Sequence, residues 1–411
     1  MPSEDLIVGL DIGTTKVCAI IGEFNDAGEI EIIGVGTSPS HGLRKGVVVN
    51  IESTLRSVTD AIEAAEMMSG REVKAVYTGI AGGHIEGINS RGVVAVTGRG
   101  REITEEDVDR VIDAAKAIVI PMDREVLHII PQEFIVDEQG GIRNPIDMIG
   151  VRLEAEVHII TSSVTSAQNL VKCVNRAGFR IDDIVLESIA SSIAVLSEDE
   201  KDLGVLLIDL GGGTTDILVH LESAPYHTSV ISVGGKQVTS DLSIMLKIPI
   251  DAAEKIKKES GCCYLPLIRN DEEIVLPGVG GWPSASIPRT ELCGIIQPRM
   301  TEVFGLIRDQ MEKKGYIKHL GGGVVLTGGG ALLSGTVELA QEIFGIPARL
   351  GYPVRMGGLI KEYQSPVYST GVGLVAYAAK EFNPGSFQGS RGKSAGDGFV
   401  DKLRKWMKEF F

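Results

Sequence analysis

The sequence predicts an α/β protein built as two related halves, because one strand-turn-strand motif occurs twice. The motif reads Asp11-Ile-Gly-Thr-Thr-Lys16 in the first half and Asp209-Leu-Gly-Gly-Gly-Thr-Thr-Asp216 in the second. Each copy follows an apolar run that is typical of a buried strand, Leu6-Ile-Val-Gly-Leu10 and Val205-Leu-Leu-Ile208. A third buried strand, Val324-Val-Leu-Thr327, runs into three glycines before a helix that is predicted to begin near Ser334.

The elements of the first half follow from hydrophobic periodicity and turn residues. Three strands are predicted over 5–37 with turns at Gly13 and at 25–28, then a helix over 50–68 and a strand over 73–80. An insert over 84–162 carries a helix that is capped by Thr104, with Glu105 and Glu106 in its first turn. The insert also carries strands over 93–97, 126–130 and 155–161. The first half resumes with a helix over 166–176, a strand over 181–186 and a helix through 196.

The second half is predicted to continue its hairpin with strands to residue 233 and helices from about 237 and 251. A long helix over 291–314 contains Pro298, which we expect to kink or restart it. A closing helix over 366–380 is expected to pack through Gly371 and Gly373. These elements predict two lobes, each with an additional subdomain. The first lobe has a core over 5–83 and 163–204 and an inserted subdomain over 84–162. The second lobe has a core over 205–242 and 320–381 and a subdomain over 243–319, and it is followed by a flexible linker over 382–398 and a terminal helix over 399–411.

The two hairpins are suited to phosphate. Glycine lets the main chain approach anionic oxygens, consecutive N–H groups form an anion-binding concavity, and threonine adds hydroxyl donors. A single Asp-x-Gly-x-Thr would equally suit an ordinary edge hairpin, but two copies together with a third glycine-rich corner favour a nucleotide clasped from both sides. The candidate phosphate contacts are Gly13, Thr14, Thr15, Gly211, Gly212, Gly213, Thr214 and Thr215.

The remaining contacts of such a nucleotide can be assigned by chemistry. Gly328, Gly329 and Gly330 form a corner where a flat purine or ribose could lie against bare backbone. Asp11 and Asp209 stand at the hairpin mouths, with Asp216 as a possible third carboxylate. We expect them to hold Mg²⁺ largely through its waters, because carboxylates and phosphates repel one another.

Composition excludes several other classes of protein. A formal net charge of -15 argues against nucleic acid as the main partner. Five scattered cysteines without Cys-x-x-Cys spacing fit a reducing cytoplasm, and seven dispersed histidines without a His-Glu-x-x-His motif give no catalytic zinc site. Glu4 and Asp5 replace a basic signal-peptide segment, and no apolar run reaches the roughly 18 to 20 residues that span a bilayer.

The order of two phosphate hairpins and one glycine-rich corner resembles the actin, Hsp70 and sugar-kinase superfamily, and the rest of the chain resembles the FtsA family of bacterial cell-division proteins. The most specific stretch is His128-Ile-Ile-Pro-Gln-Glu-Phe134, followed by Asn144-Pro145 and Gly150-Val-Arg152, in a region that resembles the FtsA-type inserted subdomain. Gly42-Leu-Arg-Lys-Gly46 and Pro298-Arg299 are also similar. The resemblance implies an actin-like (ribonuclease H-like) duplicated two-lobe ATPase fold.

The resemblance also assigns roles to individual residues. Lys16 would lie near the β- and γ-phosphates of ATP, although alone it reads as a solvated strand lysine. Glu254 and Lys257 share one helix face and would meet ribose and base, where the alternative is a charged surface helix. Glu187 occupies the position of a water-orienting glutamate, and its alternative is an acidic residue that is favourable at a helix start. Hydrolysis is expected to be weak at most.

The last thirteen residues, 399–411, predict an amphipathic helix. At about 100° per residue, its apolar side chains fall within an arc of roughly 140° that contains no charged side chain. The local side-chain charge is +4 from Lys402, Arg404, Lys405 and Lys408, less 2 from Asp401 and Glu409, which gives +2. This pattern suits an anionic membrane surface, and the alternative is docking on the protein's own body or a partner. The membrane candidates are Phe399, Leu403, Trp406, Met407, Phe410 and Phe411.

The leading hypothesis is thus an ATP-binding, polymerising division protein at the cytoplasmic face of the membrane, which anchors FtsZ filaments and helps to recruit later division proteins. The FtsZ carboxy-terminal peptide would bind the 243–319 subdomain, with Arg299 and Glu302 as candidates by family position; otherwise they are surface charges on a helix. The runner-up is a small-molecule kinase of the same fold, but no second carboxylate motif declares its substrate pocket. A chaperone would need a peptide-binding domain, for which too few residues follow the closing helix.

Overall fold

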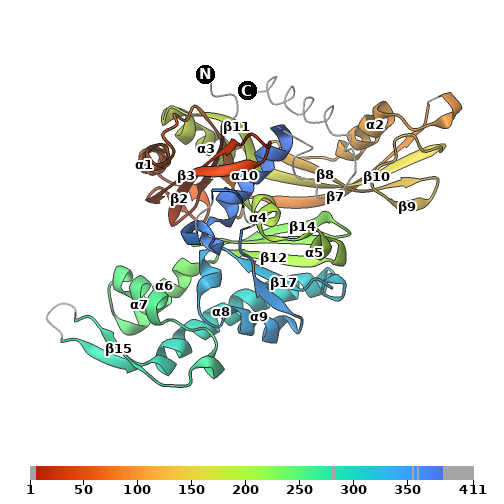
Figure 1. Cartoon of the computed structure of the whole chain (residues 1–411). Helices are drawn as coiled ribbons and strands as arrows, with labels where there is room; N and C mark the ends of the chain where they lie inside the picture. Colours follow the sequence, from red (N-terminus) through yellow and green to blue (C-terminus); the bar gives the residue numbers. More distant parts are fainter. Residues whose placement is uncertain (1–5, 98, 279–282, 354–355, 359–360, 383–411) are drawn as a thin grey trace.

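Two five-stranded sheets of the same topology form the body of the protein in a computed structural model that describes residues 6–97, 99–278, 283–353, 356–358 and 361–382 (Figure 1). In each sheet a three-stranded antiparallel meander is extended by two parallel strands. The first sheet contains β1 (Leu6–Ile12), β2 (Lys16–Phe24), β3 (Ile30–Pro39), β6 (Ala75–Ile80) and β11 (Arg180–Leu186). The second contains β12 (Val205–Leu210), β13 (Thr215–Leu221), β14 (Ala224–Ile231), β17 (Val324–Thr327) and β18 (Ala348–Leu350). The predicted duplication is confirmed.

The helices of the first lobe begin and end where the sequence provides caps. Helix α1 (Ile51–Ser69) begins at Asn50, whose side chain accepts a hydrogen bond from the Ser53 amide, and ends at Gly70 in the left-handed conformation. The predicted helix over 50–68 is confirmed within one residue at each end. Helices α3 (Val164–Arg176) and α4 (Glu187–Val195) complete the lobe, and β4 (Leu43–Arg44) and β5 (Val47–Val48) form a short ladder.

The insert forms a separate four-stranded sheet with a core of its own. Its strands are β7 (Glu86–Ala95), β8 (Arg124–Val136), β9 (Gln139–Ile142) and β10 (Arg152–Ser163), and α2 (Glu105–Lys116) packs on β7 and β10. Thr104 and Asp107 form a reciprocal capping box at the start of α2, which confirms the predicted cap. The insert also reaches the second lobe, because the Asn89 side chain donates to the Tyr226 carbonyl at 3.2 Å.

The second lobe carries a mostly helical extension beside its sheet, seen at the lower left of Figure 1. Helix α8 continues unbroken through Pro298, so the expected restart does not occur. Helix α5 (Glu198–Leu203) contacts β13. The helices that follow the second hairpin are α6 (Gly235–Leu246), α7 (Ile250–Ser260), α8 (Arg289–Lys313) and α9 (Thr336–Phe344), with strands β15 (Glu273–Leu276) and β16 (Ala285–Pro288). Short 3-10 turns occur in both the insert and the second half of the chain. They are η1 (Arg99–Arg101) in the insert, and η2 (Leu265–Leu267), η3 (Ile317–His319), η4 (Gly329–Leu332), η5 (Lys361–Tyr363) and η6 (Pro366–Tyr368) in the second half.

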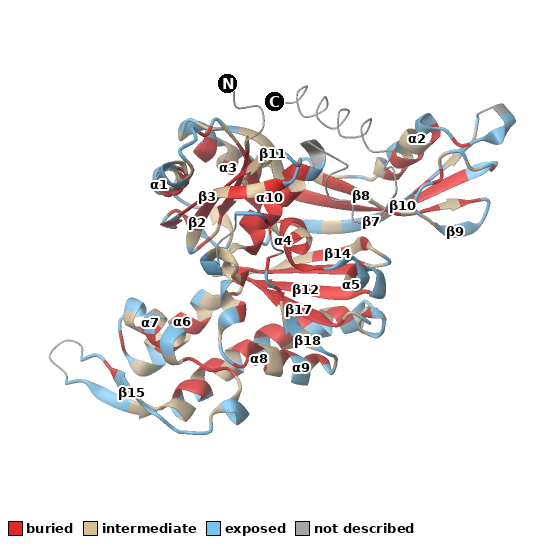
Figure 2. Ribbon diagram, in the orientation of Figure 1, coloured by how far each residue is buried: buried red, intermediate tan, exposed pale blue. Residues whose placement is uncertain are grey.

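The closing helix α10 (Ser369–Phe382) belongs to both lobes. One buried cluster joins its side chains to β1 and β2 of the first sheet and to β12, β13 and β17 of the second, and Figure 2 shows this centre as largely buried. Two glycines allow the close approach. A Cβ on Gly371 would lie 2.8 Å from Ile20 Cδ1, and a Cβ on Gly373 would lie 1.9 Å from the Ala190 carbonyl oxygen of α4. The predicted packing through Gly371 and Gly373 is therefore confirmed.

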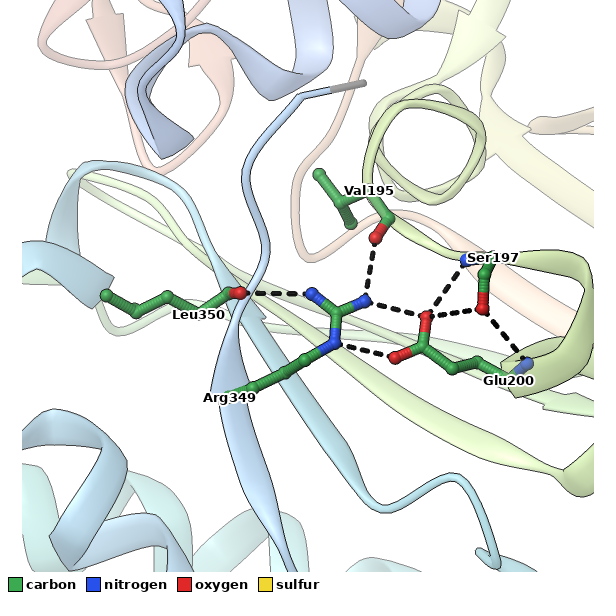
Figure 3. Close-up of polar contacts among 5 residues, drawn as sticks. All are labelled: Val195, Ser197, Glu200, Arg349 and Leu350. Carbon is green, nitrogen blue, oxygen red and sulfur yellow. Dashed lines mark hydrogen bonds and ion pairs between the residues drawn. The ribbon is translucent and has the colours of Figure 1, made fainter. Parts of the chain in front are cut away.

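A bidentate ion pair fixes the place where the chain crosses from the first lobe to the second (Figure 3). Arg349 of β18 donates from Nε and Nη2 to the two oxygens of Glu200, each at 2.6 Å, and Nη2 also donates to the Val195 carbonyl at 2.9 Å. Val195 is the last residue of α4, and Glu200 in turn accepts from the Ser197 amide at 2.9 Å. The arginine therefore ties the carboxyl end of α4 to the edge of the second sheet.

Candidate nucleotide-binding site

The two motif hairpins have the same geometry. The Gly13 amide donates to the Lys16 carbonyl at 3.0 Å, and the Gly211 amide donates to the Thr214 carbonyl, also at 3.0 Å. Each turn joins two buried antiparallel strands, so the residues at its mouth are held by the strand register: Asp11 pairs with Cys18, and Asp209 with Asp216.

The hairpins meet tip to tip. A Cβ on Gly212 would lie 1.9 Å from Thr15 Oγ1, and a Cβ on Gly213 would lie 2.8 Å from Thr14 Oγ1. Lys236, the second residue of α6, spans the same junction by donating to the Thr14 carbonyl at 2.8 Å. The structure thus brings the predicted phosphate-binding residues of both halves together, and this closeness requires glycine at position 212.

Lys16 lies on the third side of this junction. Its ammonium donates to the Val367 carbonyl at 2.8 Å, lies 4.4 Å from the centre of the Tyr368 ring and is 4.0 Å from Asp11. The cation–π contact and the carbonyl hold the charge at the entrance of α10 rather than in open solvent. The interpretation of Lys16 as a solvated strand lysine therefore does not hold.

The glycine-rich corner lies directly behind the second hairpin. Gly328 has a φ of 81°, and a Cβ there would lie 2.3 Å from Asp209 Oδ1. Gly330 is similarly close to the Leu210 carbonyl oxygen, at 2.9 Å, whereas the nearest atom to a Cβ on Gly329 is 3.9 Å away. The corner is therefore packed against the hairpin at two glycines and has free space at the middle one.

The charged pair on α7 also reaches this region. Lys257 donates to Glu254 at 2.7 Å, to the Gly235 carbonyl at 3.0 Å and to the Thr239 hydroxyl at 2.9 Å. The predicted common helix face is confirmed, and the side chains pair with each other while facing the start of α6. Gly235 donates in turn to the Gly211 carbonyl at 2.9 Å, so α7 is linked through α6 to the second hairpin.

Three buried carboxylates converge on the hairpins. Asp11 and Asp209 are 8% exposed and Asp216 is 3% exposed. Burial raises the pKa of Asp11, although the positive charge of Lys16 acts to lower it. Burial also raises the pKa of Asp209 to about 6, although the hydrogen bond from Ser191 acts to lower it. Burial and the negative charge of Asp209 together raise the pKa of Asp216 to about 8. Three buried like charges are unfavourable unless a cation compensates them.

The carboxylates fit a magnesium ion that keeps most of its waters. Asp216 Oδ1 is buried and has no hydrogen-bond partner in the described part of the chain, so it is an oxygen available to a cation or to a cation's water. Within the described part of the chain, no group of three or more histidine, cysteine or acidic side chains could by itself hold a metal ion. Waters and phosphate oxygens would therefore have to supply the other ligands.

The raised pKa of Asp216 makes a prediction about the nucleotide-free protein. A carboxyl whose folded pKa, about 8, exceeds its ordinary value of 3.8 favours the fold while protonated, and this stability is lost as the pH rises through that window. Asp216→Asn should therefore raise the melting temperature at pH 8 by about 2 °C or more, with a smaller gain at pH 5.5. Thermal unfolding in chelator measures this, and Asp26→Asn in an exposed turn is the control. An equal gain at both pH values would contradict the assignment.

Glu187 is the first residue of α4 and lies against the carboxyl end of β6, where a Cβ on Gly79 would be 2.9 Å from its Cγ. Burial raises its pKa well above the usual value, and the charges of Asp11, Asp216 and Asp209 raise it further. The structure thus brings Glu187 into the field of all three aspartates, which the alternative of a simple helix-start residue does not require.

Two hydroxyl groups of the site were missed from the sequence. Ser191 Oγ donates to Asp209 Oδ2 at 2.7 Å, and Thr370 Oγ1 is 3.0 Å from Ser191 and 3.4 Å from the same carboxylate oxygen. They come from α4 and α10, and nothing in their local sequence marks them. A signal for Lys236 was available, because Val233-Gly-Gly-Lys236 places two glycines where a strand passes into a helix.

The other predicted sites lie elsewhere. Arg299 of α8 donates to both carboxylate oxygens of Asp241 on α6, at 2.7 and 3.1 Å, and pairs with Glu302. These contacts raise the pKa of the Arg299 guanidinium. The predicted linker over 382–398 falls almost entirely, and the predicted membrane residues Phe399 to Phe411 fall entirely, outside the described residues. None of the described helices is both long and apolar enough to cross a bilayer.

Comparison with known proteins gives a consistent result. A family model described as "SHS2 domain inserted in FTSA" matches residues 82–161, and one described as "Cell division protein FtsA" matches residues 206–373. Proteins named Cell division protein FtsA from Borreliella burgdorferi, Pseudomonas aeruginosa and Escherichia coli are 48%, 45% and 39% identical, over 100%, 100% and 99% of this chain and 100%, 99% and 98% of theirs.

Solved structures show the same fold at low sequence identity. The PilM-PilN type IV pilus biogenesis complex matches with a TM-score of 0.65 at 15% identity, over 91% of this chain and 98% of that chain. MreB5 of Spiroplasma citri bound to ADP matches with a TM-score of 0.56 at 14% identity, over 93% and 100%, and the MamK double helical filament with 0.52 at 13%, over 91% and 98%. The predicted fold class, an actin-like duplicated two-lobe fold with an FtsA-type insert, is confirmed.

Proposed function

The chain belongs to the FtsA family of cell-division proteins, and we propose that it is an ATP-binding, actin-like protein that polymerises at the cytoplasmic face of the cell membrane and anchors FtsZ filaments there. The main observation in favour of nucleotide binding is that the two glycine hairpins contact each other beside three buried carboxylates. A solved neighbour in this fold is titled as bound to ADP and another as bound to AMPPNP, which supports the same proposal.

ATP would lie between the lobes. Backbone amides of 211–215 and the hydroxyls of Thr14 and Thr15 would receive its phosphate oxygens, Lys16 would add positive charge, and the Gly328–Gly330 corner with Glu254 and Lys257 would receive the adenosine. Asp11, Asp209 and Asp216 would hold Mg²⁺, which neutralises the phosphate charge when it is bound. A ligand that contacts both lobes stabilises their closed arrangement, and closure would favour assembly.

Hydrolysis would be slow, with Glu187 as the residue that orients water toward the terminal phosphate. Its position at the start of α4, facing the three aspartates, supports this role. Glu187 can take a proton from the attacking water only when its carboxyl group is ionised. Because its pKa is raised, the rate of any hydrolysis should increase as the pH rises through that pKa.

The membrane part of the proposal rests on the sequence of 399–411. One short amphipathic helix binds a bilayer weakly, but many helices side by side on a filament add avidity, so assembly and attachment would reinforce one another. MamK is titled as a double helical filament, and its fold is shared with this chain, which supports self-assembly. The 382–398 linker would give the helix reach.

We place the FtsZ peptide on the proposed 243–319 subdomain, at Arg299 and Glu302. Replacing Arg299 by glutamate should weaken binding of an FtsZ carboxy-terminal peptide by about tenfold or more, because it reverses the charge of a side chain that is proposed to contact the peptide. Fluorescence anisotropy of a labelled peptide measures the affinity, and calorimetry checks that ATP binding is intact.

The Asp241 ion pair requires a control, since Arg299→Glu also breaks it. The swapped variant Arg299→Glu with Asp241→Arg restores an ion pair between α8 and α6 with its charges reversed. If the arginine acts on the peptide, the swap regains thermal stability and not peptide affinity. Recovery of affinity in the swap would assign Arg299 a structural role, and unchanged affinity in the single variant would remove it from the site.

The function as a whole is tested by sedimentation of FtsZ with anionic liposomes in the presence and absence of this protein and ATP. We expect FtsZ to pellet with the liposomes only when the full chain and ATP are both present. FtsZ that stays in the supernatant under those conditions would refute the anchoring role. Phosphate transfer to a sugar or acid would instead support the kinase alternative.

A further inference from the structure

A small cavity lies behind the first hairpin, on the side of Glu187. It is formed where the end of β6, the β4–β5 segment and helices α3 and α4 meet, and most of the residues that line it are aliphatic or glycine. Three polar side chains face into it: His84, Ser166 and Glu187. Its room is of the order of one water molecule, and a water in such a place needs polar partners.

His84 is the unusual member of this lining. Both of its ring nitrogens are buried and neither has a hydrogen-bond partner among the described residues. Burial and the nearby Arg124 lower its pKa, so the imidazole is neutral and has one donor and one acceptor. Its backbone is held in place, because Arg124 donates to the His84 carbonyl at 2.8 Å. A buried polar group without a partner is costly, and ordered water is the usual remedy.

Two glycines of the chain that leaves β6 lie close to the side chains of His84 and Glu187. A Cβ on Gly79 would lie 3.3 Å from Glu187 Oε1, and a Cβ on Gly82, whose φ is 135°, would lie 2.8 Å from His84 Nδ1. The loop that leaves β6 therefore packs closely on both side chains, which line the same cavity. It also approaches the second lobe, since a Cβ on Gly83 would be 2.8 Å from Ser232 Oγ.

We propose that this cavity is a built site for one water molecule, which bridges an imidazole nitrogen of His84 and the carboxylate of Glu187, and that His84 is thereby a positioning residue for ATP hydrolysis. The inference rests on the proposed function of Glu187. The water would donate to the carboxylate and hold it in one orientation, so that its other oxygen faces the phosphate side. His84 itself does not touch the nucleotide.

The test replaces His84 by phenylalanine, which keeps the ring and removes both nitrogens, and by glutamine, which keeps hydrogen-bonding groups. Single-turnover hydrolysis of bound ATP should slow about tenfold in His84→Phe, because the carboxylate is no longer oriented. ATP affinity should stay within about twofold, since the side chain lies away from the nucleotide. Loss of a hydrogen bond to the charged carboxylate should also shift the pH profile of hydrolysis to higher pH. His84→Gln should retain the wild-type rate and profile.

A matched control is His220→Phe, on β13. His220 is also a buried histidine, but it pairs with Val205 at the end of the strand remote from the hairpin. This variant should leave the rate and the pH profile unchanged, so it reports the general effect of removing a buried imidazole.

Several outcomes would overturn the proposal. They are a His84→Phe variant with the wild-type rate and pH profile, a glutamine variant as slow as the phenylalanine one, and a crystal structure that resolves waters and has none between His84 and Glu187. A wild-type protein that binds ATP and releases no phosphate would overturn the positioning role and leave nucleotide binding intact. Failure of wild type to bind ATP would instead refute the proposed function.

Discussion

A single methyl group on Gly212 is expected to lower the affinity for Mg-ATP by about 100-fold or more, which corresponds to about 2.8 kcal/mol. The reason is geometric. The Cβ of alanine would lie 1.9 Å from Thr15 Oγ1 and 3.0 Å from Thr15 Cβ, so the Thr15 hydroxyl must rotate out of its position and the two hairpins must move apart. The amides of the second hairpin would then no longer face the phosphates together with the first, and binding from both sides would be lost.

Isothermal titration calorimetry with ATP and magnesium measures the loss. The control is Gly294→Ala on α8, where an added Cβ has nothing within 4 Å and helix propensity favours alanine. That variant should bind ATP as wild type does. Full affinity in Gly212→Ala would show that the nucleotide does not require the hairpin contact, and the proposed site would have to be abandoned.

The second large effect concerns the membrane. A chain that ends at Pro384 should lose at least about tenfold of its sedimentation with anionic liposomes, because the avid attachment of a filament depends on its many terminal helices. The measurement compares full-length and shortened protein, each with and without ATP. We expect ATP to increase pelleting of the full chain only.

Two single substitutions distinguish the contribution of the apolar face of the terminal helix to membrane binding from that of its charged face. Leu403→Glu places a carboxylate near the middle of the apolar arc and should release the protein from liposomes, whereas Glu409→Gln on the polar side should not. Pelleting of the shortened chain at the level of the full chain would refute the anchoring role of 399–411 while leaving the nucleotide site unaffected.

The sequence was sufficient for features that are encoded locally. Both hairpins, the capped helices that begin at Asn50 and Thr104, and the glycine corner after residue 327 follow from the order of residues within a short window. The duplication could be predicted because the Asp-x-Gly motif occurs twice, and the sheets repeat the same topology. The family resemblance added Glu187 and the α7 pair, which the structure brings toward the same carboxylates and hairpin.

What could not be predicted depends on contacts between distant segments. Ser191 and Thr370 lie 18 and 161 residues from Asp209, and no local pattern distinguishes them from other small hydroxyl residues in helices. The pairing of Arg299 with Asp241 and the continuity of α8 through Pro298 likewise depend on how helices pack. Tertiary packing overrides the local preference of proline to end a helix.

The placement of α10 has a consequence for biosynthesis. Helix α10 fills the space beside β1 and β2, which are synthesised long before it, so the first lobe lacks part of its interior until α10 has left the ribosome. During that interval the apolar side chains of Ile7 and Ile20 stay uncovered on a nascent chain, and such surfaces are what chaperones retain. The first lobe is therefore begun early in translation but can be completed only after α10 has been made.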